Sequence, residues 1–532
     1  MRIAVIGGGP GGLFAAALAR ASDPTREVTV FERNRPEDTF GFGVVFSDAT
    51  LAGIHDADPV LRTALTEHGV HWDPIEVRLH GERLLCGGNG MAAVERRMLL
   101  HLLQQRAIEV GVDLRFATEA DPDGLLAAGY DLVVAADGAN SRLRERNARV
   151  FDSCVETATA KFIWLGTTYP FDGLTFVHER GPHGVFAVHG YPIGNGVSTF
   201  IVETDEDAWR AAGLDEFDVT QPPGRSDEKS HAYLQDLFAE QIEGHPLLVN
   251  NSRWGNFRTR RTRRWRHRAG STAVALLGDA AHTAHFSVGS GTKMAMEDAV
   301  ALVAALDDHG ADIDAALAEY EAVRQPQVAK IQDSARPSLS WWEHFGRSHD
   351  ALPAWQFAYH FFTRSLPDAK LRRRDDAFVS AVHARWRAEH GAGPLESPID
   401  VAGQRLPGRL VPVAGRTARL PGDPLPLRER PPGDGGPWGL WVSAPDDEAD
   451  LPAALAAVAD GVAAGAALVA AGGGTALTRR LVCEEARLTH GAVSLLVEDG
   501  SGEQAADDAL TAVLSGRTDL VSTDPLGAGA GQ

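Results

Sequence analysis

Hydrophobic and polar positions follow two different patterns along the first half of the chain. Residues 3–6 and 28–31 are short apolar runs on either side of the alanine-rich segment 13–20, which predicts a strand, a helix and a second strand. A further helix is expected over about 94–111 and an apolar strand over 131–136. Strands that alternate with helices are typical of a parallel sheet covered by helices.

From about residue 161 to 203 the pattern changes to short strands with polar and apolar residues in alternation. Turn signals separate the segments 162–166, 184–188 and 197–202. We therefore predict an antiparallel sheet, over about 155–255, inserted into the α/β domain. The α/β pattern returns with an apolar strand at 273–277 and a helix near 292–306.

A domain boundary is predicted near residue 390, where the composition shifts to Pro, Gly, Ala and Arg. Six prolines between 421 and 437 indicate a rigid connector that packs poorly. From residue 439 onward, apolar runs at 440–442, 467–470, 493–497 and 519–521 alternate with helical segments. Residues 1–390 are thus expected to form one domain, and residues 391–532 a connector and a small α/β unit.

The length and charge of the chain limit its class. A chain of 532 residues allows two or three domains, and the net charge of −21 disfavours binding to nucleic acid or anionic membranes. No apolar run reaches membrane-spanning length, so a cytoplasmic protein is expected. The three cysteines lie far apart, which argues against disulfides, metal clusters and a redox-active dithiol, and no metal site is predicted.

The first strand leads into a glycine-rich turn, because residues 5–13 read VIGGGPGGL. In a dinucleotide-binding turn, Gly7 permits the tight turn, Gly9 lets the backbone approach a pyrophosphate, and Gly12 lets helix and strand pack closely. Glu32 ends the second strand, about 20 residues after the last glycine, where a carboxylate binds a ribose hydroxyl. The combination predicts a bound dinucleotide, with a glycine turn that binds no ligand as the alternative.

Two further segments place an aspartate directly after an apolar strand. Residues 131–142 read DLVVAADGANSR and contain Asp137, and residues 273–282 read AVALLGDAAH and contain Asp279. Gly289 and Gly291 follow at a helix start. Such groups can bind the hydroxyls and the polar edge of a flavin, although each motif alone is more often a plain turn.

One strongly basic segment departs from the acidic character of the chain. Residues 256–268 read NFRTRRTRRWRHR, with seven arginines and no acidic residue. The segment is either a solvated strand face or a binding surface for phosphates, since guanidinium groups pair bidentately with phosphate. The phosphates would belong to an anionic substrate such as a CoA thioester, or to an acidic carrier protein.

Together, these motifs resemble the flavoprotein aromatic hydroxylases, in their order and rough spacing, over residues 1 to about 390. Three segments are similar to the branch that acts on salicylyl-CoA or 2-aminobenzoyl-CoA: 31–48 (FERNRPEDTFGFGVVFSD), 161–167 (KFIWLGT) and 278–293 (GDAAHTAHFSVGSGTK). The resemblance implies a p-hydroxybenzoate hydroxylase-like α/β fold, with a Rossmann-like FAD-binding domain and an antiparallel-sheet substrate domain. It also implies that NAD(P)H, as a transient co-substrate, reduces FAD, and that O2 supplies the oxygen inserted into the ring.

The resemblance also assigns roles to particular residues. Those expected to bind FAD are Gly7, Gly9, Gly12, Glu32, Arg33, Arg96, Asp137, Asp279, Gly289 and Gly291. Those expected to bind the aromatic thioester, through the ring or the phosphates, are Phe42, Val45, Phe46, Arg258 and Arg260. His285 is the candidate base for a ring hydroxyl, with plain packing as an equal alternative, and His282 stands behind it, although a structural role is favoured there.

The tail is similar to both ends of an old-yellow-enzyme-like barrel, at 398–411 (PIDVAGQRLPGRLV) and 508–521 (DALTAVLSGRTDLV). A complete barrel needs about 250 residues, so we expect a truncated TIM-barrel remnant without FMN. Residues 472–474 (GGG) could form a phosphate loop, but a turn is favoured.

Alternatives to a thioester hydroxylase stay open at this stage. The variation at His285 and Phe286 also occurs in hydroxylases of free aromatics such as indoles, and a flavoprotein that only shelters an intermediate is a further alternative. The sequence also leaves open CoA against a carrier protein, NADH against NADPH, and monomer against homodimer.

Overall fold

The computed structural model describes residues 1–39, 41–47, 51–217, 225–289, 291–433, 435–498, 500 and 502–522. No helix in these ranges is both long and apolar enough to cross a membrane. The chain divides into two compact units: Met1–Arg78 with Asn89–Glu343, and Leu79–Gly88 with His344–Gln532. The division falls inside the 39-residue helix α11 (Ile313–Ala351), upstream of the boundary that the composition predicted near residue 390.

The first unit contains a six-stranded sheet, one strand of which leads into the glycine-rich turn. Neighbouring strands are parallel except for β16, which is antiparallel to β17. In order across the sheet, the strands are β16 (Arg266–Ala269), β17 (Thr272–Leu276), β9 (Leu132–Ala135), β1 (Arg2–Ile6), β2 (Glu27–Phe31) and β8 (Asp113–Arg115). The predicted strands at 3–6, 28–31, 131–136 and 273–277 are confirmed.

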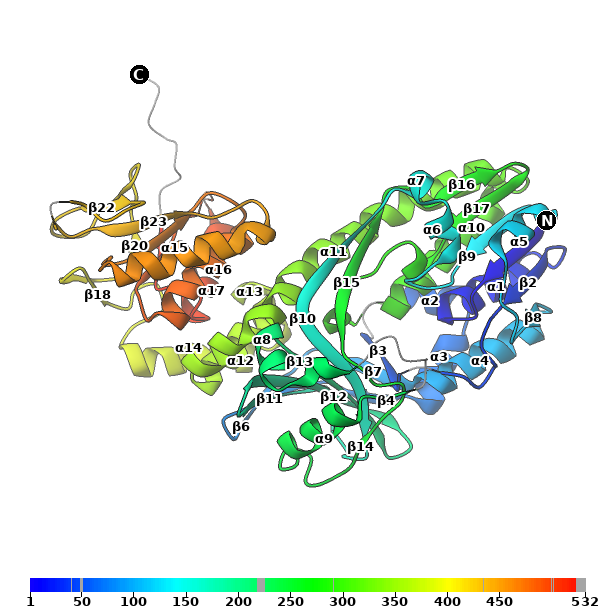
Figure 1. Cartoon of the computed structure of the whole chain (residues 1–532), viewed down its shortest axis with the longest axis horizontal. Helices are drawn as coiled ribbons and strands as arrows, with labels where there is room; N and C mark the ends of the chain where they lie inside the picture. Colours follow the sequence, from blue (N-terminus) through cyan, green and yellow to red (C-terminus); the bar gives the residue numbers. More distant parts are fainter. Residues whose placement is uncertain are drawn as a thin grey trace, which may run out of the picture. The chain divides into compact units, whose positions relative to one another are not determined.

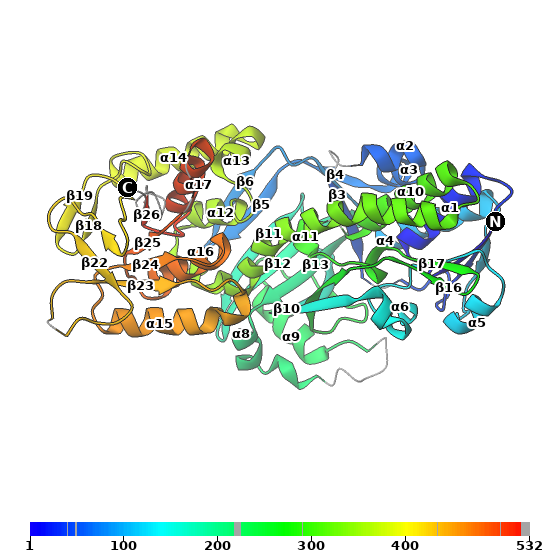
Figure 2. The ribbon, with the colours of Figure 1, turned by 90° about the horizontal axis from the view of Figure 1, so that it is seen from above.

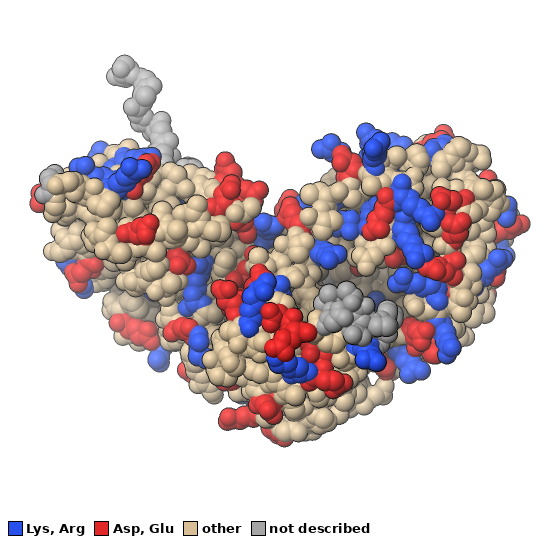
Figure 3. All heavy atoms as spheres, viewed as in Figure 1, with Lys and Arg blue, Asp and Glu red and all other residues tan. Residues whose placement is uncertain are grey.

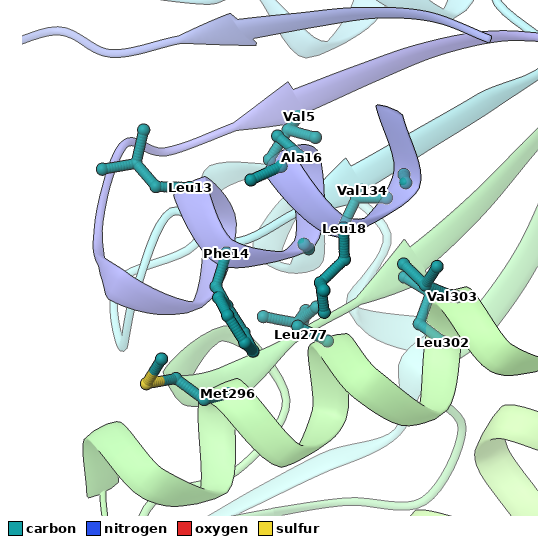
Figure 4. Close-up of a cluster of buried hydrophobic side chains, with 14 of the residues drawn as sticks. Val5, Leu13, Phe14, Ala16, Leu18, Val134, Leu277, Met296, Leu302 and Val303 are labelled. Atoms are coloured by element: carbon teal, nitrogen blue, oxygen red, sulfur yellow. The ribbon is translucent and has the colours of Figure 1, made fainter. Parts of the chain in front are cut away.

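Helices α1 (Pro10–Ser22), α4 (Arg96–Glu109) and α10 (Gly291–His309) pack together beside this sheet. Figure 4 shows Phe14 of α1 against Met296 of α10, with Leu277 at the end of β17 between the two helices. The helices approach closely at Gly11, where a Cβ atom would lie 2.8 Å from Leu277 and 2.9 Å from Ala295. The missing side chain of Gly11 therefore allows the close approach of α1 and α10.

The second sheet of this unit is mostly antiparallel and is carried by the long strand β10 (Figure 1). Its strands run in the order β14 (Leu247–Leu248), β10 (Ser153–Thr167), β13 (Val197–Thr204), β12 (Gly184–Gly194), β11 (Thr175–Gly181) and β5 (Ile75–Leu79), with β15 (Gly255–Thr262) also paired to β10. Apolar residues on one face, among them Phe186, Phe200 and Val202, pack with Phe238 into a separate core. The predicted combination of an α/β domain and an antiparallel sheet is confirmed.

The remaining elements of the first unit connect these two sheets. A small sheet contains β3 (Gly43–Ser47), β7 (Met91–Glu95) and β4 (Val70–Trp72). The other helices are α2 (Ala52–Ala57), α3 (Val60–His68), α5 (Pro122–Ala127), α6 (Arg142–Arg146), α7 (Ala148–Phe151), α8 (Glu206–Ala211) and α9 (Glu228–Leu237). The short 3-10 turns are η2 (Leu214–Glu216), η3 (Gly278–Ala280) and η4 (Phe286–Val288).

The second unit contains a mainly parallel sheet in the order β20 (Leu410–Val411), β26 (Leu520–Ser522), β25 (Ser494–Leu496), β24 (Val469–Gly472), β23 (Gly439–Ser443), β22 (Leu425–Arg428) and β21 (Thr417–Ala418). Helices α15 (Leu451–Ala463) and α16 (Ala476–Glu484) run beside β23 and β24 (Figure 2). In the part of the chain that the structure describes, the strand order does not return from β21 to β20, so the sheet stays open.

The second unit contains further elements outside that sheet. They are β6 (Glu82–Cys86), α12 (Ala354–Phe362), α13 (Asp368–Arg374), α14 (Asp376–His390), β18 (Ile399–Val401), β19 (Gln404–Leu406), η5 (Glu448–Asp450), the π-turn η6 (Glu485–Thr489) and α17 (Glu503–Leu514). The tail strands expected at 440–442, 467–470, 493–497 and 519–521 correspond to β23 to β26.

Candidate active site

The glycine turn between β1 and α1 has the geometry that a bound pyrophosphate requires. Gly7 has φ +108°, and a Cβ atom there would overlap the carbonyl of Ala136. A Cβ atom on Gly12 would overlap the carbonyl of Gly7, whereas one on Gly9 would meet nothing within 4 Å. The backbone is thus crowded on the protein side of the turn and open at Gly9, on the N-terminus of α1, where N–H groups attract anions.

Glu32 holds this turn in place from the end of β2. Its Oε2 accepts a 2.7 Å hydrogen bond from the Gly8 N–H, and its Oε1 accepts 2.8 Å bonds from the backbone and side chain of Asn34. Glu32 and Arg33 line the same hollow as Gly7 and Gly9. The carboxylate therefore shapes the turn and also faces the space beside it.

Asp137, after β9, presents an unsatisfied oxygen to this hollow. Its Oδ2 accepts a 3.0 Å bond from the Arg142 N–H, while its Oδ1 is buried without a hydrogen-bond partner among the described residues. Burial raises the pKa of this carboxyl, although the Ser141 hydroxyl lowers it. A buried acceptor that lacks a donor costs stability, so a ligand hydroxyl at Oδ1 would remove that cost.

Arg144 was missed by the sequence analysis. Its guanidinium is buried and donates to the carbonyl of Ala280 at 2.8 Å and to that of Ala139 at 2.7 Å. Burial lowers the pKa of Arg144 to about 10, and the nearby Arg260 acts in the same direction. The side chain joins the loop after β9 to the loop after β17, so both aspartate motifs depend on it for their relative position.

A second hollow continues from the first and shares Gly9, Ala136 and Gly138 with it. Its lining includes Gly9, Gly11, Gly12, Val44, Val45, Arg96, Trp164, Tyr191, Gly278, Asp279, Phe286, Gly289, Gly291 and Thr292. The two hollows form one groove from Glu32 to the aromatic side chains of β10 and β12. The groove thus joins the dinucleotide turn to the second sheet.

Arg96 and Asp279 line the inner part of this groove and interact electrostatically. Burial lowers the pKa of Arg96, and the Asp279 carboxylate opposes that shift. Burial raises the pKa of Asp279, while His282 and Arg96 oppose it. Gly289 has φ +61° and Gly291 begins α10, so backbone N–H groups border this end of the groove without a side chain in front of them.

An aromatic wall closes the inner end of the groove, and the sequence analysis assigned no role to three of its members. Trp164 on β10, Tyr191 on β12 and Phe286 on η4 line the groove together with Val45. The Trp164 and Phe286 rings meet edge to face, with 5.6 Å between their centroids. Burial raises the pKa of Tyr191 to about 12, so its hydroxyl is neutral and donates to the carbonyl of Gly43 at 3.3 Å.

The structure separates the other two side chains that were expected at the ring. Phe46 is buried in the core with α1 and α10 and does not line the groove. Phe42 lines a different cavity, together with Arg97, Ile193 and Asn250. Strand alternation explains the place of Phe46, which follows Val45 on β3 and points to the opposite face, whereas Phe42 lies before that strand.

His282 lies in the protein interior rather than in the groove lining. Its Nε2 is 2.6 Å from Oδ2 of Asp298, which also accepts from the Gly278 N–H at 3.0 Å. Arg324 donates to the other carboxylate oxygen at 2.8 Å. These contacts anchor the Gly278 loop to α10 and give His282 a structural place.

His285 is also buried, with 2% of its surface exposed, and is separate from His282. Its Nδ1 is 2.8 Å from the Ser287 hydroxyl, and its Nε2 is 3.2 Å from Oε1 of Glu203. The ring packs against Phe286, which does line the groove, with a centroid distance of 4.3 Å. Phe286 thus lies between His285 and the groove.

The arginine run occupies β15, β16 and the turn between them. Figure 3 shows Lys and Arg side chains gathered on the face that carries α6, α7 and β15, with acidic side chains among them. Ion pairs join Arg261 to Asp333, Arg263 to Asp152, Arg266 to Glu321 and Arg268 to Asp314. Four of the seven arginines therefore form ion pairs on the surface of the protein.

Arg258 and Arg260 differ from these four. Among the residues described, neither forms an ion pair; Arg258 is exposed, and Arg260 donates to the carbonyl of Ala139 at 3.1 Å. Burial and the charge of Arg258 lower the pKa of Arg260, although Glu145 opposes them. Two uncompensated cations next to the loop after β9 would attract an anion.

These features fit FAD. The open backbone at Gly9 suits the pyrophosphate, Glu32 suits the adenosine ribose, and the free Oδ1 of Asp137 suits a ribityl or ribose hydroxyl. The Gly289 and Gly291 backbone suits the polar edge of the flavin ring. The aromatic wall then leaves an apolar surface beside that ring.

Comparison with known proteins agrees with this geometry. A protein-family model described as "FAD binding domain" matches residues 1–335. The chain is 57% identical over 528 residues to salicyloyl-CoA 5-hydroxylase from a Streptomyces species, which covers 98% of this chain and 99% of that protein.

Two other relatives extend the comparison. The chain is 36% identical over 398 residues to 3-hydroxy-4-methyl-anthranilyl-[aryl-carrier protein] 5-monooxygenase from Streptosporangium sibiricum, over 74% of this chain and 99% of that one. The fold of this chain is similar to the crystal structure of p-nitrophenol 4-monooxygenase from Pseudomonas putida, with a TM-score of 0.54. The match covers 71% of this chain and 96% of that chain, at 17% sequence identity.

Proposed function

Since the chain belongs to the flavoprotein aromatic hydroxylases, which contain the FAD binding domain, we propose that it hydroxylates an aryl thioester with FAD, NAD(P)H and O2. The proposed reaction is 5-hydroxylation of salicyloyl-CoA. The observation that carries this proposal is the 57% identity to salicyloyl-CoA 5-hydroxylase over 98% of the chain, which includes the second unit.

The residues of the groove would divide the work between cofactor and substrate. The turn at Gly9, with Glu32 and Asp137, would hold the ADP and ribityl parts of FAD, and Gly289 and Gly291 would border its ring. When bound, FAD would supply the redox chemistry, with NAD(P)H as reductant and O2 as the source of the inserted oxygen. The protein binds, orients and shields these partners.

The aromatic wall would position the ring of the substrate. Trp164, Tyr191 and Phe286, with Val45, offer apolar surface close to the end of the groove where the flavin ring would lie. An ortho hydroxyl or amino group makes the position para to itself electron-rich, which is position 5 of a salicyl or anthraniloyl group. Removal of the hydroxyl proton would increase this effect, and His285 remains the candidate base.

The phosphates of the thioester would meet Arg258 and Arg260, because neither has a carboxylate partner among the described residues. The same two arginines suit the phosphopantetheine of a carrier protein, and a carrier-bound substrate is named for the relative from Streptosporangium sibiricum. We favour CoA because the relative with the higher identity and coverage is named for it.

Purified holoenzyme tests this function with four substrates: salicyloyl-CoA, anthraniloyl-CoA, free salicylate and indole. We expect salicyloyl-CoA to stimulate NAD(P)H oxidation and to yield a product heavier by one oxygen atom, hydroxylated at position 5. Stimulation by salicylate or indole alone would favour a free-aromatic hydroxylase. Absence of product with every aryl thioester would overturn the proposal.

For the second unit we propose a truncated TIM-barrel remnant that binds no FMN. Its open parallel sheet and its length support this proposal, because about 250 residues make a typical barrel. Chromatography of flavin released from the full chain should give FAD alone, and FMN in equal amount would overturn this proposal.

Light scattering would decide between a monomer and the homodimer that the sequence left open.

A further inference from the structure

Glu203 is a buried carboxylate between two histidines, behind the aromatic wall. It lies on β13 with 1% of its surface exposed. Its Oε2 is 2.5 Å from Nε2 of His189 on β12, and its Oε1 is 3.2 Å from Nε2 of His285 on the loop after β17. Glu203 and His189 have no part in the binding of FAD or of the thioester proposed above.

The two imidazoles compensate the charge of this carboxylate. Burial acts to raise the pKa of Glu203, but His285 and His189 lower it overall, so the side chain is ionised. An ionised carboxylate in the interior lowers stability unless partner groups compensate its charge with hydrogen bonds. Even then, apolar residues that fill the same space often give similar or better stability. The presence of a charge on this strand therefore calls for a role beyond packing.

The hydrogen bonds around His285 define its tautomer. The Ser287 backbone N–H donates to Nδ1 at 3.3 Å, which requires a lone pair on Nδ1. The ring proton is then on Nε2, where it is donated to Glu203. The Ser287 hydroxyl lies 2.8 Å from the same Nδ1 and 2.9 Å from the hydroxyl of Ser338 on α11.

Among the described residues, Ser287 is the polar neighbour that links His285 to the η4 turn. Phe286 and Phe257 cover its ring, with centroid distances of 4.3 and 4.9 Å, so a groove-bound substrate does not reach the imidazole directly. Ser287 is only half-buried, on the η4 turn whose neighbours Phe286 and Gly289 line the groove. Its hydroxyl contacts Nδ1 of His285 and is therefore the polar group of this turn that could pass a proton to the imidazole.

We infer that Ser287, His285 and Glu203 form a proton relay, in which Glu203 is a positioning residue that sets the tautomer of His285 and stabilises its charged form. The inference rests on the proposed function, because the proton comes from the ortho hydroxyl of the aryl thioester. That O–H bond breaks as Ser287 Oγ gains the proton, and the Ser287 O–H bond breaks as His285 Nδ1 gains one. The imidazolium then donates to the Glu203 carboxylate.

His189 supports the same carboxylate from the other side. It packs on Trp342 of α11 at 4.5 Å, and His178 of β11 stacks on the same ring at 6.3 Å. Among the described residues, the titratable group that faces Glu203 from a neighbouring element, besides His285, is thus His189, and His178 stacks on Trp342. Helix α11 adds Ser338 beside Ser287, and β15 adds Phe257 beside His285. A second histidine on Glu203 keeps the carboxylate ionised when His285 is neutral.

The test compares Glu203→Gln with the matched control Glu76→Gln. Glu76 is a buried carboxylate on β5 of the same sheet, and it accepts from Arg78 and Thr175. We expect Glu203→Gln to lower kcat with salicyloyl-CoA about 100-fold, the scale of acid–base catalysis. Anthraniloyl-CoA, whose amino group keeps its proton, should lose less than about threefold, as should both substrates in the control.

A pH profile separates the relay from a packing defect. The pH profile of kcat in Glu203→Gln should differ from that of the wild type, because the carboxylate no longer acts on the relay, and Glu203→Asp should restore part of the rate. In oxidised enzyme without NAD(P)H, the absorbance of bound salicyloyl-CoA should report phenolate at lower pH in the wild type than in the variant.

Two results would overturn the inference while leaving the proposed function intact: equal losses with both thioesters, or the same phenolate titration in wild type and Glu203→Gln. Ser287→Ala gives an independent check, because it removes the hydroxyl and leaves the His285 and Glu203 pair in place; an unchanged rate with salicyloyl-CoA would also contradict the relay. Failure of the wild type to hydroxylate any aryl thioester would instead reject the proposed function, and this inference with it.

Discussion

Nε2 of His282 lies 2.6 Å from Oδ2 of Asp298, and that carboxylate also accepts from the backbone of Gly278. The pair joins the loop after β17 to α10, so it fixes where Asp279 and Gly289 stand along the groove. Arg324 completes the charge balance from α11 at 2.8 Å. The loop next to the groove is thus held by interior contacts with Asp298 as well as by its own turn hydrogen bonds.

Replacement of His282 by Ala should therefore reduce stability more than it changes chemistry. Removal of one partner of a buried pair costs about 3–5 kcal/mol. The exposed pair of His309 and Glu319 supplies a control, since His309→Ala should cost less than about 1 kcal/mol. Urea unfolding of both variants measures the difference, and equal costs would show that the buried pair does not anchor the loop.

The same pair predicts a pH dependence of stability. His282 and Arg324 lower the pKa of Asp298 below its ordinary value of 3.8, against the effect of burial. A lowered pKa in the folded state means that the contribution is present above pH 3.8 and is lost as the pH falls through the folded pKa. In acid unfolding, Asp298→Asn should therefore show less loss of stability below this pH than the wild type.

Gly9 and Gly12 should respond differently to the same substitution. A Cβ atom at Gly12 would overlap the Gly7 carbonyl, so Gly12→Ala should fail to fold or lose stability severely. A Cβ atom at Gly9 meets no protein atom within 4 Å, so Gly9→Ala should fold and yet bind FAD at least about 10-fold more weakly. Gly53→Ala, on α2 and equally unobstructed, is the control. Circular dichroism and flavin fluorescence distinguish the outcomes, and normal FAD affinity in Gly9→Ala would contradict the assigned pyrophosphate site.

The parts of the site that the sequence predicted are those encoded by neighbouring residues. The glycine turn with Glu32, and the strands that end at Asp137 and Asp279, are local patterns in which the order of residues dictates the geometry. Such patterns also identified the two sheets and the helix α10, because hydrophobic period reports secondary structure directly.

The relay and the aromatic wall depend on contacts between distant segments. Glu203 meets His285 only because β13 lies opposite the loop after β17, and nothing in the local sequence of either segment specifies that pairing. The one available signal was a glutamate directly after the apolar residues 200–202 of this strand. Phe46 shows the reverse case, since its neighbours suggested a ring pocket while strand alternation directs it into the core.

Asp137→Asn should weaken FAD binding about 10- to 100-fold, because a hydrogen bond to a charged group contributes about 1.5–3 kcal/mol. Burial raises the pKa of Asp137 above its ordinary value of 3.8, so affinity in the wild type should begin to fall at higher pH than for an exposed aspartate. Asp131→Asn is the matched control, since Asp131 lies at the other end of the same strand and accepts from the Arg2 N–H at 2.6 Å. Titration of apoprotein with FAD measures both, and equal affinities would remove Asp137 from the site.

The charge of Arg258 and Arg260 should matter only for substrates that carry phosphates. We expect the Arg258→Ala and Arg260→Ala double variant to raise KM for salicyloyl-CoA about 10-fold, since each lost contact to a phosphate is a charge-assisted hydrogen bond. Its KM for the N-acetylcysteamine thioester of salicylate, which has no phosphate, should stay the same, as should kcat with either thioester. Arg263→Ala is the control, because Arg263 belongs to the same run, is 79% exposed and pairs with Asp152.

Rising salt should raise the KM of the wild type for salicyloyl-CoA and affect the double variant less, because screening weakens exposed charge pairs. If the double variant keeps the wild-type KM for both thioesters, the two arginines do not bind the phosphates, and the whole run is a solvated strand face.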